Sequence, residues 1–405
     1  MRSSATARNR AAAVNPYMNS LGHCGRALVA ARALRNEGWH VVALGEGAFS
    51  WLFEESGIPV FPCRSVPYDD LGKWMAYYLA GLPFVPSPEK GVWNRPHTRY
   101  SLESCARGLL RALEEHEPAV AISDGTPWAR IACQAGRVPH IALTNWTWTA
   151  DFVARMHPPV PAGLDKDETL KSYIHTPEPL VAAYNAVVTQ FGAQPITASW
   201  QALAGEVCAL ADDAVLLPDA LPPGLPPSGA LCWDGERASP HAWPMPQRPY
   251  MVVSTGTSSS SAIDAFLSRR QGRMPFAPVT IGNVRHNGRE RSIAPAHRLL
   301  CGSAGFICHG GSQSLHQALY ARVPTLVIPT HFEQLWNGWL FARHDGFWLW
   351  PEDARGQEET WEQFVRAAKK RSPVEEEPLP FPPMASKLPG ICETVLTKGG
   401  RIETG

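Results

Sequence analysis

A histidine followed by two glycines stands in the stretch GFICHGGSQSLHQAL, at 305–319. The four residues before His309 are uncharged and small or apolar, as in a buried strand, and the apolar residues from Ser312 onward recur at helical spacing. A strand, a glycine turn and a helix start direct backbone N–H groups and the positive end of a helix at whatever lies in front of them. The stretch therefore predicts a turn that binds an anion.

The elements that must position this turn alternate along the chain. A helix closed by Gly38 and a strand are expected within 22–44, and the strand at 119–123 is followed by a helix from Thr126-Pro127 and a strand at 140–144. In the second half, short apolar runs predict strands at 250–254, 278–282, 305–308, 324–329 and 347–350, with helical stretches between most of them. Such alternation predicts α/β architecture with two doubly wound parallel sheets.

The composition divides the chain. Nine prolines and no sustained periodicity mark 217–249 as a linker. We therefore expect a disordered leader (1–13), an N-terminal Rossmann-like domain (14–216), the linker, a C-terminal domain (250–382) and a C-terminal helix or tail (383–405) that packs back on the N-terminal domain.

Charge and cysteine usage exclude several classes of partner. Lysine plus arginine and aspartate plus glutamate both number 37, and this balance argues against nucleic acid or an anionic membrane as partner. The nine cysteines stand singly with no CxxC spacing, which favours reduced thiols in the cytoplasm and no zinc site. The sequence contains no run of 18 apolar residues, so no membrane span is predicted. The oligomeric state stays open between monomer and homodimer.

Three segments carry a resemblance. HGGSQSLHQALYARVPTLVIPTHFEQLWNG (309–338) resembles the donor-binding signature of family 1 nucleotide-sugar glycosyltransferases, and GHCGRALVAARALRNEGWHV and SDGTPWARIACQAGRVPHIAL are similar to two N-terminal segments of that family. The resemblance implies the GT-B fold, in which two Rossmann-like domains face each other across a cleft. It also implies an inverting transfer from a UDP- or dTDP-sugar to a hydroxyl or amine of a small apolar or aromatic acceptor, such as a natural product. Neither a metal nor a cofactor is implied beyond the nucleotide sugar as co-substrate.

The resemblance also assigns donor contacts. His309 and the amides from Gly311 to Ser314 would hold the diphosphate, Gln317 would meet the ribose, and Glu333 with Gln334 would bind sugar hydroxyls. The full donor set is Gly256, Thr257, His309, Gly311, Ser312, Gln313, Ser314, Gln317, Glu333 and Gln334. Where the family stacks a tryptophan on the base, 293–296 carries no aromatic ring, so UDP, dTDP and GDP all stay open.

Catalysis would belong to His23 and Asp124. A neutral imidazole suits removal of the acceptor's proton near pH 7, and a carboxylate on its other nitrogen sets the tautomer. The alternatives are structural: His23 could pack against its helix, and Asp124 could cap the helix that begins at Thr126-Pro127. Aromatic residues of the first domain are expected to line the acceptor pocket: Trp74, Trp93, Trp146 and Trp148. Cys24 is expected only to pack.

Two other functions fit the same pattern. A protein that keeps the fold without catalysis could activate a partner enzyme, and the missing base-stacking ring and the amide of Gln317 motivate this alternative. Another GT-B enzyme acting on nucleotide sugars, such as an epimerase, is the third possibility.

Overall fold

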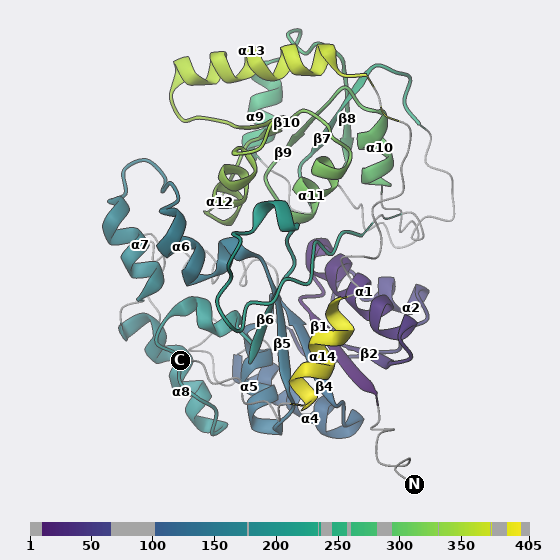
Figure 1. Cartoon of the computed structure of the whole chain (residues 1–405), viewed down its shortest axis with the longest axis vertical. Coiled ribbons are helices and arrows are strands. Elements are labelled where there is room, and N and C mark those ends of the chain that lie inside the picture. Colours follow the sequence, from purple (N-terminus) through teal and green to yellow (C-terminus); the bar gives the residue numbers. More distant parts are fainter. Residues whose placement is uncertain are drawn as a thin grey trace. The chain divides into compact units, whose positions relative to one another are not determined.

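Figure 1 shows the computed structural model of the chain. The structure describes residues 10–65, 102–175, 178–233, 235, 245–256, 261–281, 294–330, 332–372, 374 and 387–397. It divides into two compact units. The N-terminal unit comprises Met1–His157, Asp165–Leu231 and Pro382–Gly405, and the C-terminal unit comprises Pro158–Leu164 and Cys232–Phe381.

The N-terminal unit is built on a six-stranded parallel sheet with the strand order β3-β2-β1-β4-β5-β6. Four of its strands are buried along their whole length or nearly so, as expected for a parallel sheet covered on both faces. The strands are β1 Ala11–Pro16, β2 His40–Leu44, β3 Val60–Phe61, β4 Val120–Asp124, β5 His140–Thr144 and β6 Val207–Leu210.

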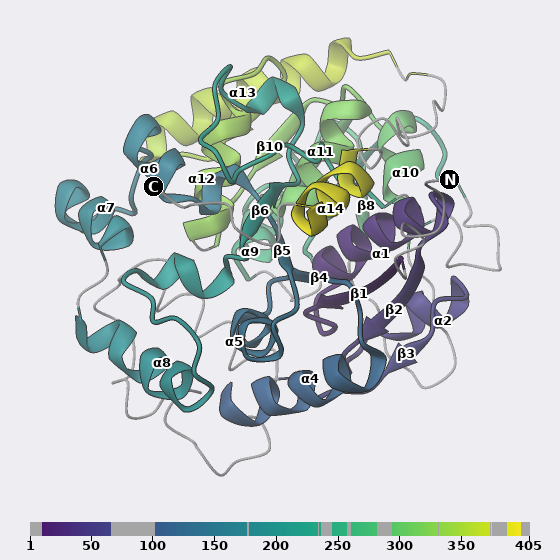
Figure 2. The ribbon, with the colours of Figure 1, turned by 60° about the horizontal axis from the view of Figure 1, so that its bottom comes forward.

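Helices cover both faces of this sheet. In Figure 2, α4 and α5 lie on one side of the strands, and α1 and α14 lie on the other. The apolar side chains of α4 and α5 form one continuous core with those of β1, β2 and β4. The helices of the unit are α1 Leu21–Asn36, α2 Trp51–Glu55, α4 Leu102–His116, α5 Pro127–Gly136, α6 Ala150–Met156, α7 Lys166–Ile174, α8 Glu178–Gln190 and α14 Lys387–Thr397, with short 3-10 turns at η3 Trp146–Trp148, η4 Ser199–Leu203 and η5 Ala214–Leu216.

The C-terminal unit contains a five-stranded parallel sheet with the order β11-β10-β9-β7-β8. Its central strands are β7 Tyr250–Ser254 and β9 Gly305–Cys308, followed outward by β8 Ala277–Ile281, β10 Thr325–Val327 and β11 Phe347–Leu349. The connecting helices are α9 Ser261–Arg269, α10 Ala296–Gly302, α11 Ser312–Tyr320, α12 Phe332–Phe341 and α13 Ala354–Lys370.

Each sheet has one point at which the winding direction reverses. In the N-terminal unit the chain runs outward from β1 to β3 on one side and from β4 to β6 on the other, so the reversal lies between β1 and β4. In the C-terminal unit it lies between β7 and β9. Open α/β sheets bind ligands beyond the carboxyl ends of the strands at such a point, because the connections there leave in opposite directions.

The units differ from the predicted domains in three places. Strand β1 begins at Ala11, inside the predicted leader. The prediction missed this start because three small alanines do not show the β-branched signal of a strand, although all three are buried. Residues 217–231 of the predicted linker belong to the N-terminal unit, and Pro158–Leu164 belongs to the C-terminal unit. Among the described helices, none has the length and apolar character needed to cross a membrane.

Candidate active site

The reversal between β1 and β4 brings the two predicted catalytic residues together. Asp124 ends β4 and is paired in register with Pro16 at the end of β1. The backbone N–H of Tyr17 donates to the carbonyl of Asp124 at 2.9 Å, so the chain leaving β1 stays beside β4. Helix α1 then begins at Leu21, which places His23 in its first turn. The two side chains meet because adjacent strands end at the same edge of the sheet.

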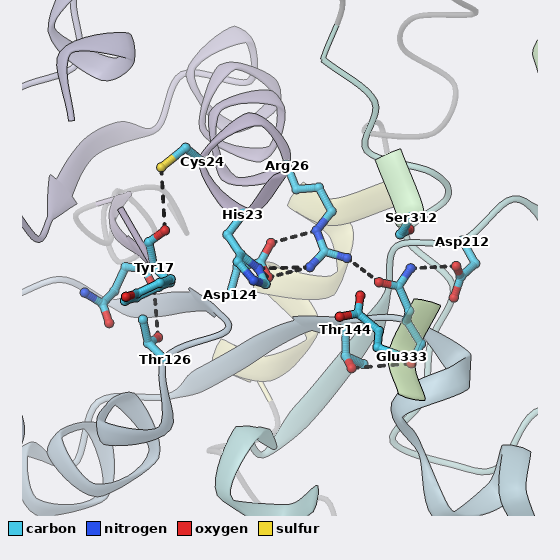
Figure 3. A network of polar contacts seen from close by, with 12 residues as sticks. Tyr17, His23, Cys24, Arg26, Asp124, Thr126, Thr144, Asp212, Ser312 and Glu333 are labelled. Carbon is cyan, nitrogen blue, oxygen red and sulfur yellow. Dashed lines mark hydrogen bonds and ion pairs between the residues drawn. The ribbon is translucent and has the colours of Figure 1, made fainter. Parts of the chain in front are cut away.

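His23 and Asp124 form a direct pair (Figure 3). The Nδ1 atom of His23 lies 2.6 Å from Oδ1 of Asp124, whose side chain is fully buried, while the imidazole is 17% exposed. Gly125 has a φ of +69°, and a Cβ at this position would lie 2.7 Å from Cε1 of His23. The imidazole therefore packs flat against a backbone that only glycine can form without a clash. With Nδ1 bound to the carboxylate, Nε2 is the nitrogen that can exchange a proton with a substrate.

Arg26, one turn further along α1, holds the same carboxylate. Its Nε donates to Oδ2 of Asp124 at 2.8 Å and one NH2 group donates to Oδ1 at 2.6 Å, while the guanidinium nitrogen also lies 3.3 Å from Nδ1 of His23. The Arg26 side chain is only 5% exposed. Figure 3 shows the guanidinium of Arg26 beside Asp124. A second polar group accepts from its other terminal nitrogen. Asp124 is therefore bound by two side chains and does not cap α5, whose N-cap residue is Thr126.

The second polar group is Asn145, which links the pair to the turn after β5. The other terminal nitrogen of Arg26 donates to Oδ1 of Asn145, and Nδ2 of Asn145 donates to Asp212 at 2.7 Å. Asp212 also accepts the backbone N–H of Trp146 at 2.6 Å. These contacts fix the start of η3, on which Trp146 and Trp148 are carried.

The predicted acceptor residues are only partly described. Trp148 is buried and its ring meets that of His23 edge to face, with 6.2 Å between the centroids. Trp146 is also buried, and its indole N–H donates to Asp151 at 3.0 Å. Trp74 and Trp93 lie outside the described residues. Of the two tryptophans that the structure describes, Trp148 is the one that contacts His23.

Cys24 stands beside His23 but serves packing. Its side chain is fully buried and its Sγ contacts the carbonyl of Tyr17 at 3.8 Å. Burial, and then the nearby charge of Asp124, raise the pKa of the Cys24 thiol well above its usual value. A thiol that stays protonated is a poor nucleophile, which agrees with the packing role expected from the sequence.

In the C-terminal unit, the reversal between β7 and β9 brings Gly256 and His309 together. Gly256 follows β7 with a φ of +75°, and a Cβ there would lie 2.9 Å from Cε1 of His309. A Cβ at Gly311 would lie 2.9 Å from Nε2 of the same imidazole. The His309 imidazole therefore packs between two glycine turns, as the ring of His23 packs on Gly125. Thr257 lies outside the described residues.

The predicted anion turn leads into α11 as expected. The N-cap residue is Gly311, which has no side chain to cap the helix. The N-cap residue therefore leaves the backbone N–H groups of the first turn uncovered. The residues of that turn are half-buried: Ser312, Gln313 and Ser314. A nine-residue helix with such a start is a suitable place for a phosphate.

Helix α12 borders the same turn. A Cβ at Gly310 would lie 2.7 Å from the carbonyl of Gln334, and Nδ2 of Asn337 donates to the carbonyl of Gly310 at 3.2 Å. The side-chain oxygen of Gln334 accepts from the backbone and the hydroxyl of Thr330, and Oε1 of Glu333 accepts from Asn337 at 3.4 Å. Both predicted sugar-binding residues are therefore held at the glycine turn.

Gln317 is engaged elsewhere. It is 7% exposed, and its amide donates to the carbonyl of Trp233 at 2.8 Å. One of its two N–H groups is thus used by the protein itself. Within the part of the chain that the structure describes, no three His, Cys, Asp or Glu side chains are grouped to hold a metal ion.

Three residues of this network were not predicted from the sequence: Arg26, Asn145 and Asp212. A signal for each was present in the sequence. Arg26 follows His23 by three residues, which places both on one side of a helix. Asn145 is a polar residue directly after β5, and Asp212 is one shortly after β6. All three are almost fully buried.

Comparison with known proteins gives three curated relatives, all from strains of Mycobacterium tuberculosis, and many solved structures. No protein-family model matches the chain. A "PGL/p-HBAD biosynthesis glycosyltransferase" of Mycobacterium tuberculosis is 22% identical over 344 residues, which cover 78% of this chain and 75% of the relative.

Two solved structures show the fold. The glycosyltransferase of kitacinnamycin superposes with a TM-score of 0.62 at 19% identity, covering 96% of this chain and 95% of that one. The glycosyltransferase VinC, solved in complex with dTDP, superposes with a TM-score of 0.56 at 16% identity, covering 96% and 99%. The predicted GT-B fold is therefore confirmed, and the resemblance to family 1 glycosyltransferases extends to the structure.

Proposed function

We propose that the protein is a glycosyltransferase that moves a sugar from a nucleoside diphosphate sugar to a hydroxyl or amine of a small acceptor. The fold it shares with glycosyltransferases supports this proposal. The observation that carries it is the pair of His23 and Asp124, 2.6 Å apart at the sheet edge where α/β proteins bind ligands.

In the proposed reaction, His23 is the general base. Its Nε2 accepts the proton of the acceptor's hydroxyl or amine as that group attacks the anomeric carbon of the sugar. Asp124 keeps the other nitrogen protonated and stabilises the imidazolium that forms. The new bond forms on the face opposite the departing diphosphate, so the configuration at the anomeric carbon is inverted. General bases of this kind contribute about 10²–10⁴-fold to the rate.

The C-terminal unit would hold the donor. We assign the diphosphate to His309 and the backbone N–H groups that open α11. The negative charge on the leaving group grows as the sugar bond breaks, and fixed N–H dipoles stabilise such charge without having to reorganise. This arrangement supplies the stabilisation that a metal ion supplies elsewhere, and we propose that the transfer is metal-independent. Glu333 and Gln334 would bind hydroxyls of the sugar.

The acceptor is proposed to be an apolar or aromatic natural product. Trp148 lies beside His23, the proposed general base, and an indole ring favours a flat, apolar partner. The donor base is proposed to be thymine or uracil, since the related fold of VinC binds dTDP. We further propose a cytoplasmic enzyme, because all nine cysteines are free thiols and eight of them are buried.

Nucleotide binding tests the donor assignment. Calorimetry with dTDP, UDP and GDP should give binding for at least one of the three. His309→Ala should weaken that binding at least about tenfold, since a single charge-assisted contact contributes about 1.5–3 kcal/mol. His344→Ala, in the same unit but after the end of α12, is the matched control and should leave binding unchanged. Wild-type affinity in the His309 variant would remove His309 from the donor site.

One observation favours a second candidate function, a non-catalytic protein that activates a partner enzyme. The buried amide of Gln317 is bound to Trp233, which leaves less of it for a ribose. A protein with no affinity for any of the three nucleotides at millimolar concentration would support this alternative.

A further inference from the structure

We infer that Arg26 is a positioning residue that keeps the catalytic imidazole neutral before reaction by supplying the counter-charge of Asp124. The inference rests on the proposed role of His23 as a base. It concerns a residue that neither touches substrate nor belongs to the histidine–carboxylate pair.

The geometry singles out Arg26 among the groups around His23. The guanidinium binds both oxygens of Asp124, at 2.8 and 2.6 Å, in the bidentate arrangement that gives the strongest carboxylate contacts. Arg26 and Asp124 are both excluded from solvent, so their mutual attraction is little screened. The carboxylate is thus already paired with a cation when the imidazole is neutral.

Among the residues that the structure describes, two charged side chains contact His23. Asp124 of β4 and Arg26 of α1 contact it, whereas Tyr17 and Trp148 present ring edges at 6.4 and 6.2 Å. Cys24 directs its thiol to the carbonyl of Tyr17. The charges that bear most directly on the protonation of His23 are therefore the carboxylate of Asp124 and the guanidinium of Arg26, with the carboxylate of Asp212 further away beyond Asn145.

Removing the guanidinium would change that balance in one direction. A buried carboxylate without a counter-ion carries a large desolvation penalty, and His23 would be the cation nearest to it. The imidazole would then become an imidazolium before the acceptor arrives, which blocks its use as a base. In the native cluster, Arg26 offsets the carboxylate, and Asp212 restores part of the negative charge through Asn145.

The order of proton binding therefore depends on Arg26. With the guanidinium present, His23 takes its proton from the acceptor during the reaction. The charge of the imidazolium is then balanced by the second carboxylate of the cluster, Asp212, in addition to the shared Asp124.

The test compares charge with shape at position 26. Arg26→Met and Arg26→Gln remove the charge, Arg26→Lys keeps it, and Arg35→Met removes an exposed arginine near the end of the same helix. The pH dependence of kcat/KM is measured for each, together with the NMR titration of the His23 imidazole. In the two neutral variants, the acidic limb of the profile and the NMR midpoint should move to higher pH by at least about one unit.

The controls separate electrostatics from folding. Arg26→Lys should keep the position of the acidic limb while kcat falls several-fold, because an ammonium cannot bind Asp124 and Asn145 together. Arg35→Met should change neither. The KM for the donor should stay the same in all variants. Arg26→Gln preserves hydrogen bonding and serves where Arg26→Met does not fold.

Two results would overturn the inference. One is a uniform loss of activity at every pH with an unmoved NMR midpoint in the neutral variants. The other is an equal shift in Arg26→Lys. Because the NMR titration needs no substrate, it decides the role of Arg26 even where the protein transfers no sugar. Failure of the proposed function would instead appear as absent nucleotide binding and absent transfer in the wild-type protein.

Discussion

The contacts that hold the imidazole of His23 suit its proposed role as a base better than they serve stability. A buried Asp124 bound by an arginine and a histidine costs desolvation energy that an apolar cluster of the same size would not. Such a group is retained when its charge has a task. At this scale the proposed function depends on Nε2 being free to accept one proton from the acceptor.

Substitution of His23 tests that task. His23→Ala should lower kcat at least about 100-fold and leave nucleotide binding unchanged, because the base acts only in the transition state. Steady-state kinetics and calorimetry on the same preparation measure the two quantities. Retained turnover in this variant would show that another group removes the proton.

His23 and Asp124 were predicted from the resemblance, which matches the two N-terminal segments that carry them, whereas Arg26 was not predicted. The spacing of three residues from His23 was a signal for Arg26, but the stretch GRALVAARAL does not say that Arg26 reaches Asp124 while Arg32 donates to the hydroxyl of Ser56. The contact depends on the register between β1 and β4, which sequence spacing does not encode. Cys24 was correctly assigned to packing, because nothing near it suggested thiol chemistry.

At the scale of elements, each unit has a strand-to-helix turn in which a histidine ring packs on a glycine. Gly125 and Gly256 both have a positive φ, and both lie under a histidine. The turns allow each imidazole to rest on bare backbone, so that each ring is supported by main-chain atoms.

A methyl group under His23 should displace it. Gly125→Ala places a Cβ 2.7 Å from Cε1, in a left-handed backbone conformation. We expect a loss of turnover of at least about tenfold, together with about 1–2 kcal/mol of stability, since a small misplacement of a base is costly. Enzyme kinetics and denaturant unfolding measure the two effects.

Gly192→Ala is the matched control. Gly192 has a φ of +64°, and a Cβ there meets nothing within 4 Å. The variant should lose comparable stability with unchanged turnover. If both alanine variants lose activity equally, backbone strain explains the loss and the contact with the imidazole does not.

Most strands and the glycine turn before α11 were predictable, because buried parallel strands are short apolar runs and α11 follows directly after Gly311. The described strands at 140–144, 250–254 and 305–308 have the predicted bounds. The start of β1 was missed because its alanines owe their strand conformation to pairing with β2 and β4. The division of the chain into units was less accessible, since it depends on contacts between segments distant in sequence.

At the scale of the whole molecule, the buried polar groups set the response to acid. His140 is fully buried beside Ser123, whose hydroxyl lies 2.7 Å from Nε2. Burial, and then the charge of Arg130, lower the pKa of His140 to about 3. The unfolded chain binds this proton near pH 6.5, so stability is lost as the pH falls from about 6.5 toward 3.

His140→Gln should flatten this dependence. A glutamine keeps a hydrogen bond to Ser123 and takes up no proton. Between pH 6 and pH 4, the free energy of unfolding of the wild type should fall more steeply than that of the variant, by up to about 1.4 kcal/mol per pH unit. Urea unfolding at several pH values measures both slopes. Parallel slopes would show that His140 does not contribute.

The last described helix has a consequence for synthesis. Helix α14 contacts α1 and β6, so it belongs to the unit that contains the first strand. In Figures 1 and 2 it lies beside α1. A ribosome releases residues 387–397 only after the entire C-terminal sheet has been made. During synthesis, the surface of α1 and β6 that α14 contacts therefore stays uncovered until the C-terminal sheet has been translated.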